Sequence, residues 1–334
     1  MNQHTQFKLF AAFAAIYFIW GSTYLAIKYA LTALPPFLMM GTRSLAAGFI
    51  LYLWSRARGA GRVKRENLLP LLTIAILFFL VGHGLLAWGQ QRIASGSAAL
   101  LVASEPLWIA LIEAFLVRED KASLRTIIGM ACGLSGLGLL LAPGQQFSTA
   151  HLDFGGAFAI LVGTLSWSIG AVYSRVAKLP STPALVAGLQ LMVGGFLLIL
   201  TGLLMGEGSR LQIAALSLLP LLSWVYLVVF GSVVAFTAYV WLLRITSATR
   251  VATHTYVNPV IAVFLGWALA GEPVSMQTFA ATIVIVISVY LVLGQNRERR
   301  NSSLPIASKT RAVSSSNAMD PWPLPAVAPK PESS

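Results

Sequence analysis

The chain has 334 residues, of which 57% are hydrophobic and 10% charged, whereas soluble domains carry about a quarter charged residues. Its eleven carboxylates are too few to give a protein of this size a water-facing surface. The composition therefore excludes a water-soluble enzyme, a nucleic-acid-binding protein and a disordered scaffold, and it indicates a polytopic membrane protein.

Ten apolar segments are long enough to cross a membrane as helices, because a hydrocarbon core about 30 Å thick needs roughly 20 residues. In chain order we expect them at residues 9–33, 37–54, 68–89, 96–117, 124–142, 154–174, 184–205, 218–243, 250–270 and 275–294. None has the alternating pattern of a membrane β-barrel strand. The first continues through Trp20 without a clear cleavage site, which indicates a retained helix rather than a signal peptide. The sequence thus predicts an all-α membrane protein.

The basic residues indicate how these segments are oriented. With the N-terminus in the cytoplasm, 19 of the 23 Lys and Arg residues fall in cytoplasmic segments and only Arg92 and Arg210 fall outside. The remaining two, Lys28 and Arg43, lie within helices. Positive residues concentrate on the cytoplasmic side of membrane proteins. We therefore expect both termini in the cytoplasm, and the net charge of +12 needs no nucleic-acid partner.

The two halves of the chain resemble each other. Residues 88–121 align with residues 241–274, which pairs Pro106 with Pro259 and places Glu105 opposite Asn258. Five helices in each half, an odd number, give the second copy the opposite orientation in the membrane, an arrangement typical of alternating-access transporters. We expect a cytoplasmic N-terminus over 1–8, repeats over 9–142 and 154–294, and a disordered cytoplasmic tail over 295–334, which is polar and rich in Ser and Pro.

Several short motifs resemble those of a known family. They are Trp20-Gly21-Ser22-Thr23-Tyr24, Arg43-Ser44-Leu45-Ala46-Ala47, Glu105-Pro106-Leu107-Trp108, Asn258-Pro259 and Gly271-Glu272-Pro273. On these motifs the chain is similar to EamA-type members of the drug/metabolite transporter superfamily, and among them to the YedA-like permeases. The resemblance covers about residues 8–295 and implies ten helices in two inverted halves, an inner-membrane location and the movement of small metabolites, often outward.

Ionisable side chains inside a membrane are costly and indicate function. Glu105 lies near the middle of the fourth segment beside Pro106, which bends the helix and frees a backbone carbonyl. Glu105 either binds an amino or cationic group, titrates as the coupling proton site, or is a protonated carboxyl that serves packing. Glu113, near the cytoplasmic end of that segment, either lines an inner vestibule or pairs with an arginine of the basic loops.

Trp20, Tyr24 and Lys28 recur every four residues and form one stripe of the first helix. An aromatic stripe that ends in a cation suits an aromatic substrate with a carboxylate. Alternatively, the rings pack against Trp167 and Lys28 extends towards the outer surface. Arg43 is expected to be structural, fixing a bond between helices, and Pro106 and Pro259 are expected to shape the backbone.

Further polar residues on the apolar segments complete the candidate substrate site. His83 and Gln90 share one helix face, and His254 and Asn258 share another at a spacing of four. The histidines either relay protons or are satisfied buried imidazoles. Gln190 and Tyr239 are additional candidates. Two histidines on different helices, without paired Cys or Asp, do not form a metal site, so we expect neither metal nor cofactor.

Two other functional classes fit the sequence less well. A membrane enzyme acting on diphosphates needs carboxylate clusters for Mg²⁺, but Asp120, Asp153 and Asp320 all lie in loops. A channel needs a filter or charge ring, and none is visible. We therefore expect a non-enzymatic secondary transporter that exports amino acids or related metabolites, or alternatively an organic-cation efflux permease. Its partners are a small-molecule substrate, the lipid bilayer and protons as a candidate coupling ion, and the chain is a monomer or homodimer.

Overall fold

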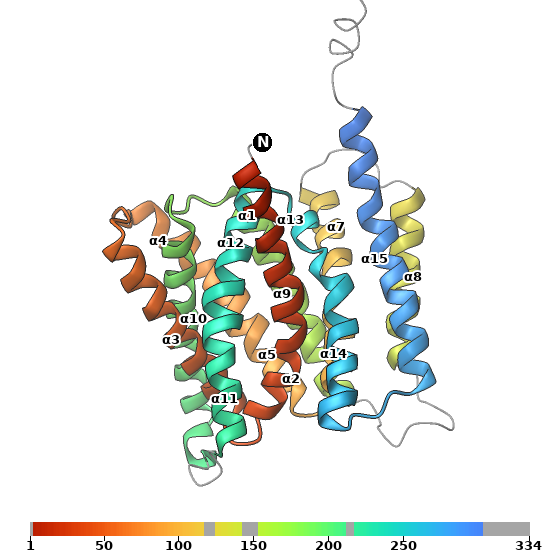
Figure 1. Cartoon of the computed structure of the whole chain (residues 1–334), viewed down its shortest axis with the longest axis horizontal. Helices are drawn as coiled ribbons and strands as arrows, with labels where there is room; N and C mark the ends of the chain where they lie inside the picture. The colour runs from red at the N-terminus through yellow and green to blue at the C-terminus, as the bar shows by residue number, and fades with distance from the viewer. Residues whose placement is uncertain (1–2, 117–123, 142–152, 212–216, 303–334) are drawn as a thin grey trace, which may run out of the picture. The chain divides into compact units, whose positions relative to one another are not determined.

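The computed structural model describes residues 3–116, 124–141, 153–211 and 217–302, and every regular element in these ranges is a helix. The chain divides into two units, residues 1–295 and 296–334, and the candidate site lies in the first (Figure 1). Within the described residues, seven helical stretches are long and apolar enough to cross a membrane, and two shorter apolar helices cover Val257–Ala270 and Met276–Ser288.

Every segment expected to span the membrane is mainly helical where it is described. The first half contains α1 (Gln3–Ala14), α2 (Trp20–Ala30), α3 (Pro36–Ala57), α4 (Arg65–Ala75), α5 (Gly84–Gln90), α6 (Ser95–Val102), α7 (Glu105–Leu116) and α8 (Leu124–Leu141). The second half contains α9 (Phe154–Val176), α10 (Pro183–Leu204), α11 (Leu218–Tyr226), α12 (Thr237–Ile245), α13 (Ala248–Val251), α14 (His254–Ala270) and α15 (Met276–Ser302). A short 3₁₀ helix covers Glu207–Arg210.

Three of the long stretches contain wide π-helical turns, a feature common at functional sites. These turns cover Ala15–Ile19 between α1 and α2, Ile76–His83 between α4 and α5, and Leu227–Phe236 between α11 and α12. The fourth stretch breaks instead, between α6 and α7. Pro106 then lies in the first turn of α7, where the missing N–H costs nothing. Pro259, by contrast, lies inside α14.

Helices α3 and α10 pack along two pairs of glycines. Each helix is 22 residues long and begins with a proline. A Cβ on Gly195 would lie 2.8 Å from the Gly41 carbonyl oxygen, and one on Gly48 would lie 2.8 Å from the Gly188 carbonyl oxygen. Only glycine permits such a close approach of two backbones. The contact therefore holds an element of the first half tightly against one of the second.

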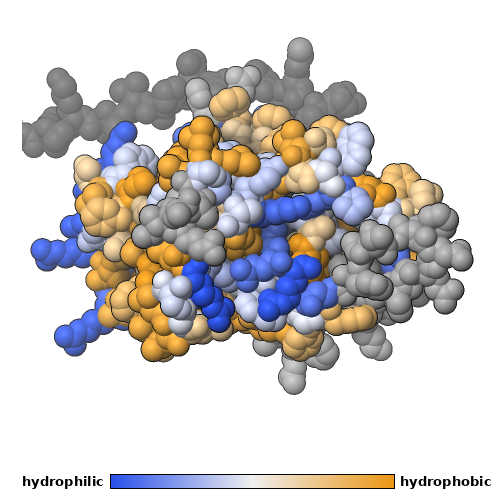
Figure 2. All heavy atoms as spheres, turned by 90° about the horizontal axis from the view of Figure 1, so that it is seen from below, coloured by the Kyte–Doolittle hydropathy of each residue, from blue (hydrophilic) through white to orange (hydrophobic). Residues whose placement is uncertain are grey.

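Large apolar side chains cover the outer surface of the helices. Phe196 is 61% exposed and Leu204 is 80% exposed, and neither would be stable facing water. In Figure 2, hydrophilic residues gather at the middle of one face while hydrophobic residues lie along its sides. This distribution suits a surface surrounded by lipid.

The expected C-terminal tail begins one residue before the second unit, but its first residues are helical. Helix α15 continues to Ser302, so residues 295–302 are helical rather than disordered. The stretch contains Gln, Arg and Glu, which are good helix formers, and no proline or glycine that would end the helix. Residues 303–334 of the expected tail lie outside the described residues.

Candidate functional site

A central cavity in the 1–295 unit has a volume of about 70 Å³. It is lined by residues of α2, α3, α5, α6, α7, α9 and α14, and of the π-helical turn before α5. Seven of the residues expected to bind substrate meet here: Trp20, Tyr24, His83, Glu105, Trp167, His254 and Asn258. The sequence therefore identified most of the polar and aromatic cavity wall.

Glu105 and His254 form a buried pair at the cavity, and each side chain is 3% exposed. The Glu105 Oε2 atom lies 3.6 Å from His254 Nε2. His254 Nδ1 lies 2.9 Å from the Val251 carbonyl oxygen, which can only accept, so Nδ1 must carry a hydrogen. Glu105 Oε1 has no hydrogen-bond partner. At 3.6 Å these two atoms are too far apart for a hydrogen bond, but either of them can carry a proton while Oε1 remains available to a ligand.

Asn258, one turn along α14 from His254, ties this helix to the first span. Its amide nitrogen donates to the Tyr17 carbonyl oxygen at 2.8 Å and to the His254 carbonyl oxygen at 3.1 Å. Tyr17 belongs to the π-helical turn before α2, and its hydroxyl lies 2.6 Å from Thr253 Oγ1. Two polar contacts therefore fix α14 against the first span beside the cavity.

Aromatic rings form much of the cavity wall. Trp20 lies 5.9 Å from Trp167 and 5.1 Å from His254 between ring centroids. His83 stacks on Trp167 at 5.0 Å. The Trp167 indole donates a hydrogen bond to the Tyr239 hydroxyl at 2.9 Å, which fixes the plane of the ring. Rigid rings beside a carboxylate suit a ligand with an apolar or aromatic body and an amino group.

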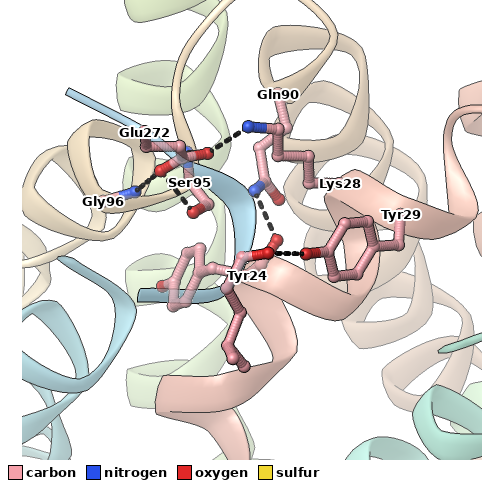
Figure 3. A network of polar contacts seen from close by, with 8 residues as sticks. Tyr24, Lys28, Tyr29, Gln90, Ser95, Gly96 and Glu272 are labelled. Carbon is pink, nitrogen blue, oxygen red and sulfur yellow. Dashed lines mark hydrogen bonds and ion pairs between the residues drawn. The ribbon is translucent and has the colours of Figure 1, made fainter. Parts of the chain in front are cut away.

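Lys28 does not line the cavity and pairs instead with Glu272, as Figure 3 shows. Its Nζ lies 2.7 Å from Glu272 Oε1. The same carboxylate accepts hydrogen bonds from the Ser95 backbone N–H at 3.0 Å, the Ser95 hydroxyl at 2.7 Å and the Gly96 N–H at 3.4 Å. The predicted aromatic stripe therefore divides, with Trp20 and Tyr24 at the cavity and Lys28 in this ion pair.

The Glu272 contacts join three elements: the end of α2, the start of α6 and the link between α14 and α15. A carboxylate at the start of a helix is stabilised by the free backbone N–H groups there. Burial raises the pKa of the Glu272 carboxyl, but the hydrogen bonds from Lys28 and Ser95 outweigh burial and hold the pKa below its ordinary value. We refer to Lys28, Ser95, Gly96 and Glu272 as the Glu272 clamp.

The other expected residues lie beside the cavity or away from it. Gln90 donates to the Tyr24 carbonyl oxygen at 3.2 Å and supports the wall from behind. Tyr239 does not line the cavity, but its hydroxyl accepts the hydrogen bond from the Trp167 indole. Gln190 is 1% exposed in α10, its Oε1 has no partner, and it does not line the cavity. Glu113 lies 3.9 Å from Arg175, an ion pair of the kind expected with a basic loop.

Sequence reasoning missed two features of this region. Arg43, expected to serve structure alone, bonds to Ser232 but also lines the cavity. Glu272 was noted only as a motif residue, although its position opposite Glu119 in the repeat was a usable signal. Glu119 itself lies outside the described residues. Among the residues that are described, no three His, Cys, Asp or Glu side chains meet in a way that could hold a metal ion.

Comparisons with known proteins agree with this architecture. The EamA-like transporter family matches residues 7–142 and 154–294. The chain is 35% identical to the "Uncharacterized inner membrane transporter YedA" of Escherichia coli over 287 residues, which cover 85% of this chain and 90% of YedA. It is 27% identical to "Protein PagO" of Salmonella typhimurium, with 91% and 96% covered. One crystal structure superposes with a TM-score of 0.62 at 23% identity, covering 85% and 96%, which shows a shared fold.

The family match covers most of the chain, and the apolar helices account for a multi-pass protein of the bacterial inner membrane. The chain belongs to the EamA-like transporter family.

Proposed function

We propose that this protein is a secondary transporter that moves small metabolites across the inner membrane by alternating access around the central cavity. The observation that carries the proposal is the buried Glu105–His254 pair within the central cavity. Sites that bind small molecules are typically hollows with an apolar lining and a few convergent polar groups. An ionisable pair buried among membrane helices is costly and is kept where it handles a substrate or an ion.

The proposed architecture has ten membrane helices in two inverted repeats, residues 9–142 and 154–294, with both termini in the cytoplasm. The contact between α3 and α10 supports it. The two helices have equal lengths, their first prolines are 147 residues apart, and the glycines at matching offsets meet crosswise. A twofold axis between the halves would produce this crossing. One half would then rock against the other about this axis.

The proposed cargo is an amino acid, aromatic or otherwise zwitterionic, and the proposed direction is export. Trp20 and Trp167 offer rings to an apolar side chain, and the free Glu105 Oε1 offers an acceptor to an amino group. An organic cation with an apolar body could bind to the same rings and the same acceptor. An efflux permease for organic cations is therefore the second candidate.

A proton and an amino group would compete for Glu105. With one proton on Glu105 or His254, the pair has no net charge and does not attract an amino group. Loss of that proton leaves a carboxylate that attracts an amino group. Such competition at one site is what an antiporter needs to exchange a substrate for a proton, so we assign the coupling role to Glu105.

The test is transport by purified protein in proteoliposomes loaded with labelled tryptophan or leucine, with and without an imposed pH gradient. We expect the gradient to accelerate movement in the wild type and Glu105→Gln to abolish the acceleration. Glu66→Gln is the control, because Glu66 is 48% exposed and lies 3.6 Å from Lys64 and 3.9 Å from Lys178. It should behave as the wild type.

Each result has a distinct meaning. If the wild-type transport rate is the same with and without the pH gradient, the protein is a uniporter and Glu105 has no coupling role. Movement of a labelled organic cation, with none of either amino acid, would replace the first candidate by the second. Gradient-driven transport that persists in Glu105→Gln would contradict the assignment of Glu105.

A further inference from the structure

The cavity contains a second buried charge, the guanidinium of Arg43 on α3, whose residue is 3% exposed. Its Nε donates to the Ser232 hydroxyl at 2.9 Å, and Nη1 lies 3.5 Å from the Met40 sulfur, a weak acceptor. A guanidinium carries five N–H donors. Three of them therefore have no acceptor among the residues that the structure describes.

The surroundings hold the guanidinium in place. A Cβ on Gly231 would lie 2.9 Å from Arg43 Nη2 and 3.2 Å from the Thr23 methyl carbon, so the absence of a side chain at Gly231 makes room for the group. The Gly231 carbonyl oxygen accepts a hydrogen bond from the Trp20 indole at 3.1 Å. The guanidinium is thus fixed beside an aromatic residue of the cavity wall.

A purely structural role does not account for the charge. The bond to Ser232 uses one donor, and a neutral side chain could make it equally well. A buried cation that lacks an anion is strongly unfavourable, and more so within a membrane. No carboxylate of the described residues lies within 4.0 Å of Arg43, and the ion-pair partner of Glu105 is His254. Because Arg43 lines the cavity without a carboxylate in direct contact, a ligand in the cavity can supply that anion.

We propose that Arg43 binds a carboxylate of the transported molecule, so that the cavity takes a zwitterion with its amino group at Glu105 and its carboxylate at Arg43. This inference rests on the proposed function and narrows its cargo. Arginine suits the role because its planar fork can make two parallel hydrogen bonds to one carboxylate. His83, whose Nδ1 is buried without a partner, is a further polar group on the same wall.

Charge balance then determines selectivity. A zwitterion compensates both buried charges at once. A simple cation satisfies Glu105 and leaves Arg43 uncompensated, whereas a simple carboxylate does the reverse. The inference therefore favours amino acids over the organic cations that the Glu105 site alone would accept.

Binding to the purified protein in detergent, measured by calorimetry, tests this selectivity. The ligands are tryptophan, its amide, tryptamine and indole-3-propionate, which share one ring and differ in charge. We expect the wild type to bind tryptophan most tightly. Arg43→Gln should weaken tryptophan binding by about tenfold or more, the effect of losing a charged hydrogen bond, and leave tryptamine binding unchanged. Arg56→Gln, an exposed position on the same helix, should change neither.

The thermal stability of the ligand-free protein is an independent readout. If Arg43 is an uncompensated charge, Arg43→Gln will be as stable as the wild type or more stable. A less stable variant would show that the arginine holds the helices together, and it would overturn the inference even if no ligand of the series bound.

The binding results also separate the two proposals. Equal wild-type affinity for tryptophan and tryptamine would overturn the role of Arg43 and leave the transporter with its organic-cation alternative. Binding of indole-3-propionate alone, lost in Arg43→Gln, would support the carboxylate site and overturn the amino-acid cargo of the proposed function.

Discussion

Neutralising Glu272 should loosen the link between the first and last spans. In Glu272→Gln, one oxygen is replaced by an amide nitrogen that cannot accept the hydrogen bonds from Ser95 or Gly96. Glu272 is 6% exposed, so a backbone N–H left without an acceptor has little access to water. An unsatisfied buried donor costs about 1–3 kcal/mol, and turning a charged hydrogen bond into a neutral one costs about 1 kcal/mol more.

The total loss is about 2–4 kcal/mol. The Lys28 pair adds little to this figure because the lysine side chain is 37% exposed and water screens it. At about 2 °C per kcal/mol for a large chain, the apparent Tm falls by roughly 4–8 °C. Intrinsic tryptophan fluorescence during heating measures it, at one fixed scan rate because unfolding of such proteins is often irreversible.

Glu66→Gln is the matched control for this measurement. It removes the same charge from an exposed site whose ion pairs are worth less than about 1 kcal/mol, so its apparent Tm should shift by less than about 2 °C. If Glu272→Gln has the same apparent Tm as the Glu66→Gln control, the reasoning is refuted, because the Glu272 clamp then contributes no net stability.

Two further predictions concern the pH dependence of the clamp and the packing of α3 on α10. The pKa of Glu272 is lowered in the folded protein, so its stabilisation is complete above the ordinary carboxyl value of 4.5 and is lost as the pH falls through the lowered pKa; the Tm difference between wild type and Glu272→Gln should close below that pH, and a difference that grows there would contradict the assignment. Gly195→Ala should reduce the yield of monodisperse protein in size-exclusion chromatography, because its Cβ would lie 2.5 Å from the Leu45 nitrogen, whereas Gly138→Ala on α8, with no atom within 4 Å, should not. Equal yields of the two variants would show that α3 and α10 can separate without loss.

The sequence predicted site residues best where a side chain is energetically unfavourable in its surroundings, such as an acid within a membrane span. Glu105 stood out because it is an acid in an apolar segment beside a proline, and the structure places it in the cavity wall. Trp20 stood out in an aromatic stripe that was expected either to meet substrate or to pack against Trp167, and the two rings lie 5.9 Å apart. Apolar length also located most helix ends to within about three residues, apart from the start of the first helix at Gln3 and the end of the last at Ser302.

Contacts between distant parts of the chain could not be predicted in the same way. The partner of Lys28 is Glu272, on a link near the other end of the chain, and only the packing of α14 beside α2 brings the two together. Arg43 was assigned from its match to a motif, which says nothing about how many of its donors find acceptors. The π-helical turns have no periodic signal of their own, because they change the backbone within an otherwise continuous apolar run.

The crossed glycine contact has a consequence for how the two halves depend on each other. Gly41 faces Gly195 and Gly48 faces Gly188, so each half presents the same patch to the other, which is the geometry of an isologous dimer interface. Here the interface lies within one chain. Substitution of a single glycine in one half disrupts only one of the two equivalent contacts. Substitution of the matching glycine in the other half disrupts the other contact. The two halves can therefore diverge in their cavity residues, as Glu105 and Asn258 have, while the shared patch keeps them joined.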